Sequence, residues 1–322
     1  MKQFALAAIL ATVAATTVSA AEVAARKVTF PSNGETIVGT LYVPSDTAAE
    51  TRRPGVIVAG AWTSIKEQMS GLYAKEMAER GFVALAFDYR GWGESSGTIR
   101  FKEDPATKTA DIIAAADFLS TLSEVDPDAI NGLGICASAG YMADAVSGNP
   151  KFRSLSLVAP WLHNKAIVEE VYGGAEGVAK LIAVSRSAER AEEKGSPRVI
   201  LAASATDESS LMYQIPYYTE ADRGLVPQYD NKFNLGSWEP WLTYDSVATG
   251  SRVDKPVLLV HSEAAAVPEG AHAFLGLLKV DATTRWFEGV TQFDFYDRQQ
   301  HVDAAADAVA EHIEKVLGRR SN

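Results

Sequence analysis

The chain has 322 residues with one cysteine and five histidines, and 41 acidic against 30 basic side chains give it a formal net charge of −11. A hydrophobic fraction of 47% is enough for a large core and excludes a disordered chain. The negative charge argues against nucleic acid as a partner, because phosphates require clustered Lys and Arg. A single cysteine excludes an internal disulfide and a Cys-based zinc cluster.

The first 20 residues have the pattern of a secretory signal peptide. Lys2 supplies a positive start, an apolar stretch begins at Phe4, and small residues precede a predicted cleavage site after Ala20. The stretch is too short and too rich in Thr and Ser for a membrane span, which needs about 20 apolar residues. We therefore expect residues 1–20 to be removed, and the mature chain to be periplasmic or secreted without stable membrane insertion.

The next segments predict strands that alternate with helices. Residues 25–30 and 36–43 alternate in polarity around a turn at 31–34, which predicts a β-hairpin. Continuous apolar runs then alternate with stretches of helical periodicity. The runs are residues 55–59, 82–87, 129–135 and 155–159, and the helical stretches are 66–80, 106–122 and 139–147. Strands without polar alternation indicate a mostly parallel sheet that helices cover on both faces.

This rhythm is interrupted between residues 161 and 254, where the pattern is mixed and rich in Tyr, Trp and Asn. The alternation resumes with runs at 256–261 and 284–288 and helical stretches at 268–278 and 299–317. We interpret 161–254 as a lid or cap insertion, and 21–160 with 255–322 as one α/β core. Open α/β sheets bind ligands at the carboxyl ends of their strands, so we expect the lid to cover that edge.

The clearest candidate site follows the run at 129–135, where Gly134-Ile135-Cys136-Ala137-Ser138 leads into a helix. A nucleophile elbow, usually G-x-S-x-G, needs a strand, a strained turn and small neighbours in this order. Cys136 then stands at the nucleophile position, although a second register would place Ser138 there. A free cysteine is more commonly a small buried core residue. The end of the apolar run favours Cys136 as the nucleophile.

These segments resemble the α/β-hydrolase superfamily, and within it the branch of dienelactone-hydrolase-like and Xaa-Pro-peptidase-like enzymes. The elbow, the loop at 60–68, the turn at 87–95 and the lid segment at 238–242 occur in the order of that branch. The resemblance implies an α/β-hydrolase fold with a lid insertion. In such a fold, we expect the backbone N–H groups of Ala137 and of Trp62 or Thr63 to form the oxyanion hole.

Two positions depart from the pattern that this resemblance implies. Gln292 stands where the family has its catalytic histidine, and a carboxamide cannot act as a general base. Alanines at 264–266 stand where the family has an acid, which leaves Glu263 as a candidate acid. His163, after the strand beside the elbow, is the best alternative base among the histidines. A similar segment occurs in the family beside an intact triad, which favours packing or substrate contact for His163.

Two functions follow as hypotheses. In the first, Cys136 attacks a small ester, thioester, lactone or amide and forms an acyl-enzyme, its thiol pKa lowered by the helix N-terminus. In the second, the chemistry has lapsed and the fold binds a small ligand. In either case four aromatic residues are candidates to line the pocket, with lid packing as their alternative role: Trp161, Tyr217, Trp238 and Trp241. We expect no cofactor and no metal, because the sequence has no P-loop, dinucleotide fingerprint or clustered ligand set.

Overall fold

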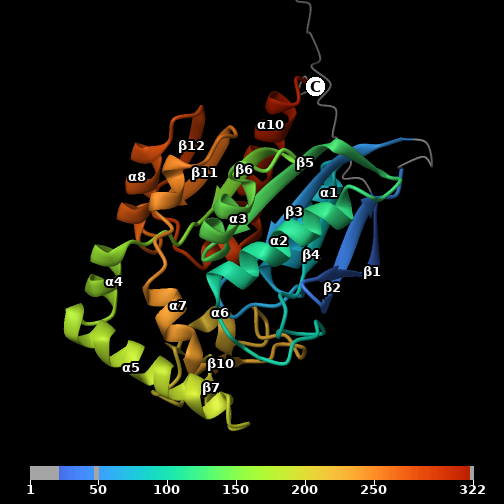
Figure 1. The fold of residues 1–322 in the computed structure, drawn as a ribbon. Coiled ribbons are helices and arrows are strands. Elements are labelled where there is room, and N and C mark those ends of the chain that lie inside the picture. Colours follow the sequence, from blue (N-terminus) through green and yellow to red (C-terminus); the bar gives the residue numbers. More distant parts are fainter. Residues whose placement is uncertain (1–21, 47–50, 320–322) are drawn as a thin grey trace, which may run out of the picture.

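The predicted strands form one eight-stranded sheet in the computed structural model, which describes residues 22–46 and 51–319. The predicted signal peptide at 1–20 lies outside the described residues. In spatial order the strands are β1 (Val23–Ser32), β2 (Glu35–Pro44), β4 (Val83–Phe87), β3 (Arg53–Ala59), β5 (Val125–Ile135), β6 (Phe152–Val158), β11 (Val257–Ser262) and β12 (Ala282–Phe287). Figure 1 shows this sheet crossing the molecule.

The sheet is parallel from β4 to β12, and only β2 runs against its two neighbours among the described strands. The hairpin between β1 and β2 turns at Asn33 and Gly34, whose φ angles of 46° and 86° match the two positive values of a type I′ turn. The central strands are buried on both sides, as the apolar runs predicted. The mostly parallel central sheet is therefore confirmed.

Helices cover both faces of the sheet, as predicted. They are α1 (Met69–Glu79), α2 (Pro105–Leu119), α3 (Ser138–Val146), α8 (Pro268–Leu277) and α10 (Gln299–Val316), with the short α9 (Asp294–Asp297) before the last. In Figure 1, α2 and α3 lie in front of the sheet and α10 lies behind it. Helix α1 packs against α10, and Arg80 at its end donates to Asp307 over 2.8 Å. No helix among residues 22–46 and 51–319 has the length and apolarity to cross a bilayer.

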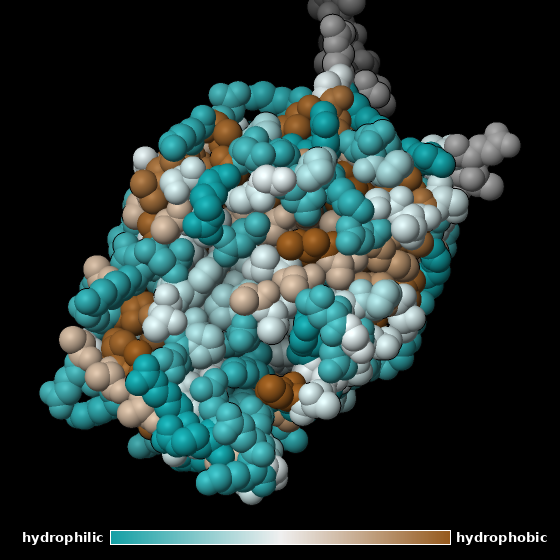
Figure 2. All heavy atoms as spheres, in the orientation of Figure 1, coloured by the Kyte–Doolittle hydropathy of each residue, from teal (hydrophilic) through white to brown (hydrophobic). Residues whose placement is uncertain are grey.

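The segment for which the sequence predicts a lid forms a group of elements below the sheet in Figure 1, all of them short except the helix α5 (Gly174–Glu192). These are α4 (Lys165–Val171), α5 (Gly174–Glu192), β7 (Val199–Leu201), β8 (Ala203–Ser204), β9 (Met212–Tyr213), α6 (Pro216–Thr219), β10 (Lys232–Asn234), η1 (Leu235–Ser237), α7 (Trp238–Leu242) and η2 (Ala248–Ser251). Arg223 joins this group to the core through an ion pair of 2.6 Å with Asp297. Figure 2 shows the face of the molecule that is seen in Figure 1. Hydrophilic side chains cover most of that face, and its hydrophobic patches are small and separate.

Helix α3 lies unusually close to β5, and glycines in the strand make this approach possible. A Cβ at Gly134 would lie 2.7 Å from the carbonyl oxygen of Ser138 and 2.9 Å from the Cα of Ala139. A Cβ at Gly132 would lie 2.6 Å from the sulfur of Met142. The absence of these side chains lets the chain turn from strand to helix within a few residues, which is the turn that carries Cys136.

We expect Gly134→Ala to lower the free energy of unfolding by about 1–3 kcal/mol, because the new methyl group meets backbone atoms that cannot move aside easily. The matched control is Gly276→Ala in α8, where a Cβ meets nothing within 4 Å. That change should be neutral or should stabilise the helix by up to about 1 kcal/mol. Urea unfolding of both variants measures the difference. Equal stabilities would contradict the close packing of α3 on β5.

Candidate active site

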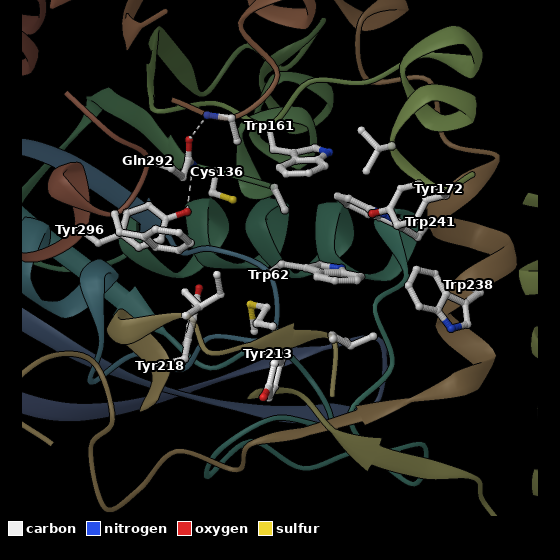
Figure 3. Close-up of a pocket in the computed structure, with 17 residues that line it drawn as sticks. Trp62, Cys136, Trp161, Tyr172, Tyr213, Tyr218, Trp238, Trp241, Gln292 and Tyr296 are labelled. Atoms are coloured by element: carbon white, nitrogen blue, oxygen red, sulfur yellow. Dashed lines mark hydrogen bonds between the residues drawn. The ribbon is translucent and has the colours of Figure 1, made fainter. Parts of the chain in front are cut away.

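A cavity of about 590 Å³ lies between the carboxyl ends of the strands and the elements of residues 161–254. Its wall is mostly aromatic and contains no charged side chain. The aromatic lining residues are Trp62, Trp161, Tyr172, Tyr213, Tyr218, Trp238, Trp241, Phe293 and Tyr296. Figure 3 shows Cys136, Gln292 and Tyr296 at one end of the cavity, and Tyr172, Trp238 and Trp241 at the other. Such a cavity suits an uncharged, apolar group, because a buried charge would find no partner.

Cys136 occupies the turn between β5 and α3 and lines the cavity. Its φ of 55° is a left-handed conformation that costs free energy in a non-glycine residue. Backbone hydrogen bonds hold the turn: the Cys136 N–H donates to the carbonyl of Val158 over 3.2 Å, and the Cys136 carbonyl accepts from the N–H of Trp161 over 2.9 Å. These contacts tie the strained residue to the neighbouring strand and to the segment that follows it.

Ser138, the nucleophile in the second possible register, faces away from the cavity. Its buried hydroxyl donates to the carbonyl of Gly60 and lies 2.9 Å from the hydroxyl of Tyr89. Ser138 is not among the residues that line the cavity. Of the two registers that the sequence left open, only the one with Cys136 places a nucleophilic atom in the cavity.

Two backbone N–H groups, those of Trp62 and Ala137, are close enough to the sulfur of Cys136 to favour its charged form and lower its pKa. Ala137 precedes α3, and Trp62 lies in the loop after β3. A carbonyl oxygen of a substrate attacked by Cys136 would meet the same two donors. Thr63 was the alternative donor in this loop, but its N–H donates to a carboxylate oxygen of Glu103 over 2.7 Å. The expectation for Thr63 is therefore wrong, because its N–H already has a partner outside the cavity.

Glu103 is a buried carboxylate that supports this loop, and the sequence offered no signal for it. Besides the Thr63 N–H, it accepts from the ammonium of Lys108 over 2.7 Å and from the hydroxyl of Tyr141 over 3.3 Å. Thr63 itself has a φ of 60°. The carboxylate thus holds the residue after Trp62 in a conformation that side-chain-bearing residues seldom adopt.

Gln292 sits in the loop after β12 with all of its polar atoms engaged. Its NH₂ group donates to the carbonyl of Ala159 over 2.8 Å and to the hydroxyl of Tyr296 over 2.9 Å. Its carbonyl oxygen accepts from the backbone N–H of Ala266 over 3.1 Å. A neutral side chain therefore occupies this position and is fixed by three hydrogen bonds, and the one with Tyr296 is drawn in Figure 3.

Tyr296 lies between Gln292 and Cys136. Its hydroxyl accepts from Gln292, so its own proton is directed to the sulfur of Cys136, with which it forms a hydrogen bond. Burial raises the pKa of Tyr296 well above the usual tyrosine value, which keeps the hydroxyl protonated. Sequence reasoning missed this residue. Its signal was its place four positions after Gln292, a spacing at which two side chains meet on one helical turn.

The Cys136 thiol has a raised pKa, contrary to the expectation from its place before a helix. Burial is the largest influence and raises the pKa, because an apolar cavity disfavours the charged thiolate. Hydrogen bonds from Tyr296, Trp62 and Ala137 act in the opposite direction and do not outweigh the burial. The site therefore holds a thiol near neutral pH and has donors ready to receive negative charge.

The candidate acid Glu263 does not reach this network. Its carboxylate lies 2.8 Å from Nε2 of His272, and both side chains are largely exposed. At the position facing Gln292, the structure places the backbone of Ala266 instead. The prediction of Glu263 as the acid is wrong because the alanine-containing loop turns it outward to the surface.

His163, the alternative base, is buried behind the cavity wall. Its Nδ1 accepts from the indole of Trp161 over 3.1 Å, and its Nε2 lies 3.1 Å from the carbonyl of Trp241. Burial lowers the pKa of His163 to about 4. With both ring nitrogens engaged, His163 holds two tryptophans of the wall in place and cannot take a proton from Cys136. The packing role that the family's similar segment favoured agrees with this geometry.

Three of the four aromatic residues singled out as pocket candidates, Trp161, Trp238 and Trp241, are on the cavity wall. Tyr217 is not, because its hydroxyl points into the core and accepts from the N–H of Met69 over 3.1 Å. Its neighbour Tyr218 lines the cavity instead. Successive residues of a helical turn point about 100° apart, so only one of the two can face the cavity. Within the described part of the chain, no group of three or more His, Cys, Asp or Glu side chains could hold a metal ion.

Comparison with known proteins gives relatives that match most of the chain, and no family model matches it. The uncharacterized protein PA2218 of Pseudomonas aeruginosa is 29% identical over 316 residues, which cover 91% of this chain and 82% of that one. The uncharacterized protein YcjY of Escherichia coli is 29% identical over 307 residues, which cover 90% of this chain and 99% of that one. A thiohydrolase, aneE of Aspergillus aculeatus, is 28% identical over 128 residues, 40% of this chain and 39% of its own length.

Solved structures share the whole fold. The crystal structure of PA2218 matches with a TM-score of 0.81 at 26% identity, over 92% of this chain and 94% of that one. The α/β hydrolase GrgF from Penicillium matches with a TM-score of 0.77 at 16% identity, over 92% and 99%. The chain therefore has the α/β-hydrolase fold. Est1E from Butyrivibrio proteoclasticus, solved with bound ferulic acid, matches with a TM-score of 0.61 at 18% identity, over 91% and 100%.

Alkylation by iodoacetamide reports on Cys136 alone, because the chain has one cysteine. Since burial raises its pKa, we expect the pH midpoint of alkylation to be higher in the folded protein than in the urea-unfolded protein. Tyr296→Phe removes a hydrogen bond that lowers this pKa, so the midpoint should rise further.

The control for this measurement is Tyr213→Phe, which changes another tyrosine of the cavity wall. The Tyr213 hydroxyl is paired with Gln214 and has no contact with the sulfur, so the midpoint should stay unchanged. A folded midpoint below the unfolded one, or equal shifts in the two variants, would contradict the network described above.

Proposed function

We propose that the protein is a Cys136-dependent enzyme of the hydrolase class that cleaves a small thioester or activated ester with an uncharged, apolar acyl group. The observation that carries the proposal is the position of the thiol. Cys136 faces an uncharged cavity, and the N–H groups of Trp62 and Ala137 hydrogen-bond to its sulfur. These donors are where the oxygen of a tetrahedral intermediate would need them.

The first chemical step forms a thioester between the acyl group and Cys136. The sulfur attacks the substrate carbonyl while Trp62 and Ala137 donate to the oxygen, which carries the developing negative charge. The bond to the leaving group then breaks, and the thiol proton of Cys136 leaves with that group. The hydroxyl of Tyr296 favours the charged form of the sulfur and so stabilises it as this proton leaves.

The absence of a strong base on the cavity wall favours thioesters over oxyesters and amides. A leaving thiol has a pKa of about 8.5, so it departs as an anion with little help from an acid. An alkoxide or an amine leaves only with efficient proton donation, which the family's histidine would provide and Gln292 does not. The partial match to a thiohydrolase supports the same choice of substrate.

Export of the protein is a further part of this proposal. The pattern of residues 1–20 supports cleavage after Ala20 and a periplasmic or secreted mature chain. Expression in a Gram-negative host and N-terminal sequencing of the periplasmic or culture fraction test it. A mature chain that begins at Ala21 is the expected result, and retention of Met1 in the cytoplasmic fraction would contradict it.

Intact-protein mass spectrometry tests the proposed chemistry directly. We expect S-phenyl thiobutanoate to add one acyl group to the protein, p-nitrophenyl butanoate to react more slowly relative to its uncatalysed rate, and Cys136→Ala to remove both reactions. Ser138→Ala is the matched control and should keep the acylation, because Ser138 faces away from the cavity.

Acylation that persists in Cys136→Ala would overturn the assignment of the nucleophile. If neither ester acylates the folded protein while apolar small molecules bind the cavity, the alternative function holds, a hydrolase fold that binds a ligand without turning it over.

A further inference from the structure

The cavity provides no group that could activate water for the second half of the reaction. Attack by water on an acyl-enzyme requires a base, since the pKa of free water is 15.7. The titratable side chains on the wall are Cys136 and tyrosines. Burial raises the pKa of Tyr172 to about 12, and it raises the pKa values of Tyr218 and Tyr296 well above the usual tyrosine value. These hydroxyls are therefore protonated and accept a further proton poorly.

Gln292 cannot replace the missing base, although it occupies the right place. Its NH₂ group donates to Ala159 and Tyr296, and its oxygen accepts from Ala266. If the carboxamide were turned over, its oxygen would face the carbonyl oxygen of Ala159 and lose that hydrogen bond. The side chain is thus held in one orientation, and in neither orientation does it take up a proton near neutral pH.

Titratable groups behind the wall do not line the cavity. Glu103 is paired with Lys108 and with the N–H of Thr63. His163 has both ring nitrogens engaged by the two tryptophans. His261 is buried and packs edge-on against Trp286. None of these three groups is on the wall beside Cys136.

We infer that the acyl group on Cys136 is transferred to a second thiol rather than to water, so that the complete reaction exchanges an acyl group between two thiols. This inference rests on the proposed function, because it requires the acyl-enzyme. A free thiol has a pKa of about 8.5, so a few per cent of it is thiolate near neutral pH without any base in the protein. The acceptor thiol therefore supplies its own anion near neutral pH, which water does not.

The atoms balance in both halves without an oxidant or a metal. In the first half, the donor's carbon–sulfur bond breaks as the bond to Cys136 forms, and the Cys136 proton leaves on the donor thiol. In the second half, the acceptor sulfur forms the new carbon–sulfur bond, the bond to Cys136 breaks, and the acceptor's proton returns to Cys136. The Cys136 thiolate that leaves in this step receives hydrogen bonds from Tyr296, Trp62 and Ala137, which make it a better leaving group.

The cavity also indicates the chemical class of the acceptor. Its aromatic wall contains no Lys or Arg that could pair with an anionic thiol compound, and no Asp or Glu for a cationic one. Its volume of about 590 Å³ leaves space beside a short acyl group. The acceptor is therefore a thiol whose reactive arm is uncharged.

The test begins with the full-length mature protein acylated at Cys136 by S-phenyl thiobutanoate and freed from the donor by rapid gel filtration. The acyl-enzyme is then divided between buffer, N-acetylcysteamine and N-acetylethanolamine, which is the matched alcohol. We expect loss of the acyl group to be at least about tenfold faster with the thiol than in buffer, with S-butanoyl-N-acetylcysteamine as the product, because only the thiol supplies its own anion. The alcohol should behave like buffer.

Two comparisons separate enzymatic transfer from simple exchange. The urea-unfolded acyl protein gives the intrinsic rate with N-acetylcysteamine, and the folded protein must exceed it. Gln292→His should accelerate loss of the acyl group in buffer and so lower the ratio of thiol to water rates, because it restores a base at that position.

The outcomes are distinguishable from those that concern the proposed function. Failure to form the acyl-enzyme overturns the proposed function, and the inference with it. Formation of the acyl-enzyme followed by equally fast loss in buffer and in thiol leaves the proposed function standing and overturns transfer to a thiol. A ratio unchanged in Gln292→His, or a folded rate no higher than the unfolded one, also overturns the inference.

Discussion

The site depends on one strained turn, in which the chain leaves β5 and enters α3 at Cys136. The residue has a left-handed backbone, with a φ of 55°, and this conformation persists only because its surroundings hold it. Gly134 allows the helix to approach the strand, and backbone hydrogen bonds from the turn to Val158 and Trp161 anchor it to the next strand and the start of the lid. The same turn directs the N–H of Ala137 to the sulfur. The same turn therefore sets the position of the sulfur, the backbone strain of Cys136 and the hydrogen-bond donor beside the sulfur.

The environment of the thiol combines two opposing influences. Burial in an uncharged aromatic cavity raises its pKa, and three hydrogen bonds to the sulfur lower it without compensating fully. Such a site does not hold a thiolate before the reaction, but its hydrogen-bond donors can stabilise negative charge that develops during the reaction. Donors that act more strongly on the transition state than on the ground state lower the barrier. The pair Gln292 and Tyr296 fits the same cavity, because neither side chain carries a charge that would need a buried partner.

Much of the fold follows from local pattern, and so does the position of Cys136 at the turn after β5. The continuous apolar runs and the helical stretches between them correspond to the strands and helices of the sheet, since burial on both faces leaves that signature in any parallel strand. The elbow was recognisable because its small residues are a steric requirement of the turn. Gln292 was recognisable as a departure because it stands in an otherwise ordinary segment of the family.

The remaining parts of the site are produced by contacts between distant segments, which no local pattern encodes. The sequence by itself determined the alternation of strands and helices, the turn of small residues that carries Cys136, and a glutamine at position 292, which cannot act as a base. The tertiary structure decided that Ser138 faces the core, that the N–H of Thr63 belongs to Glu103, and that Tyr296 reaches the sulfur. Each depends on which way a side chain or an N–H group points, and that direction is set by packing between elements far apart in the chain.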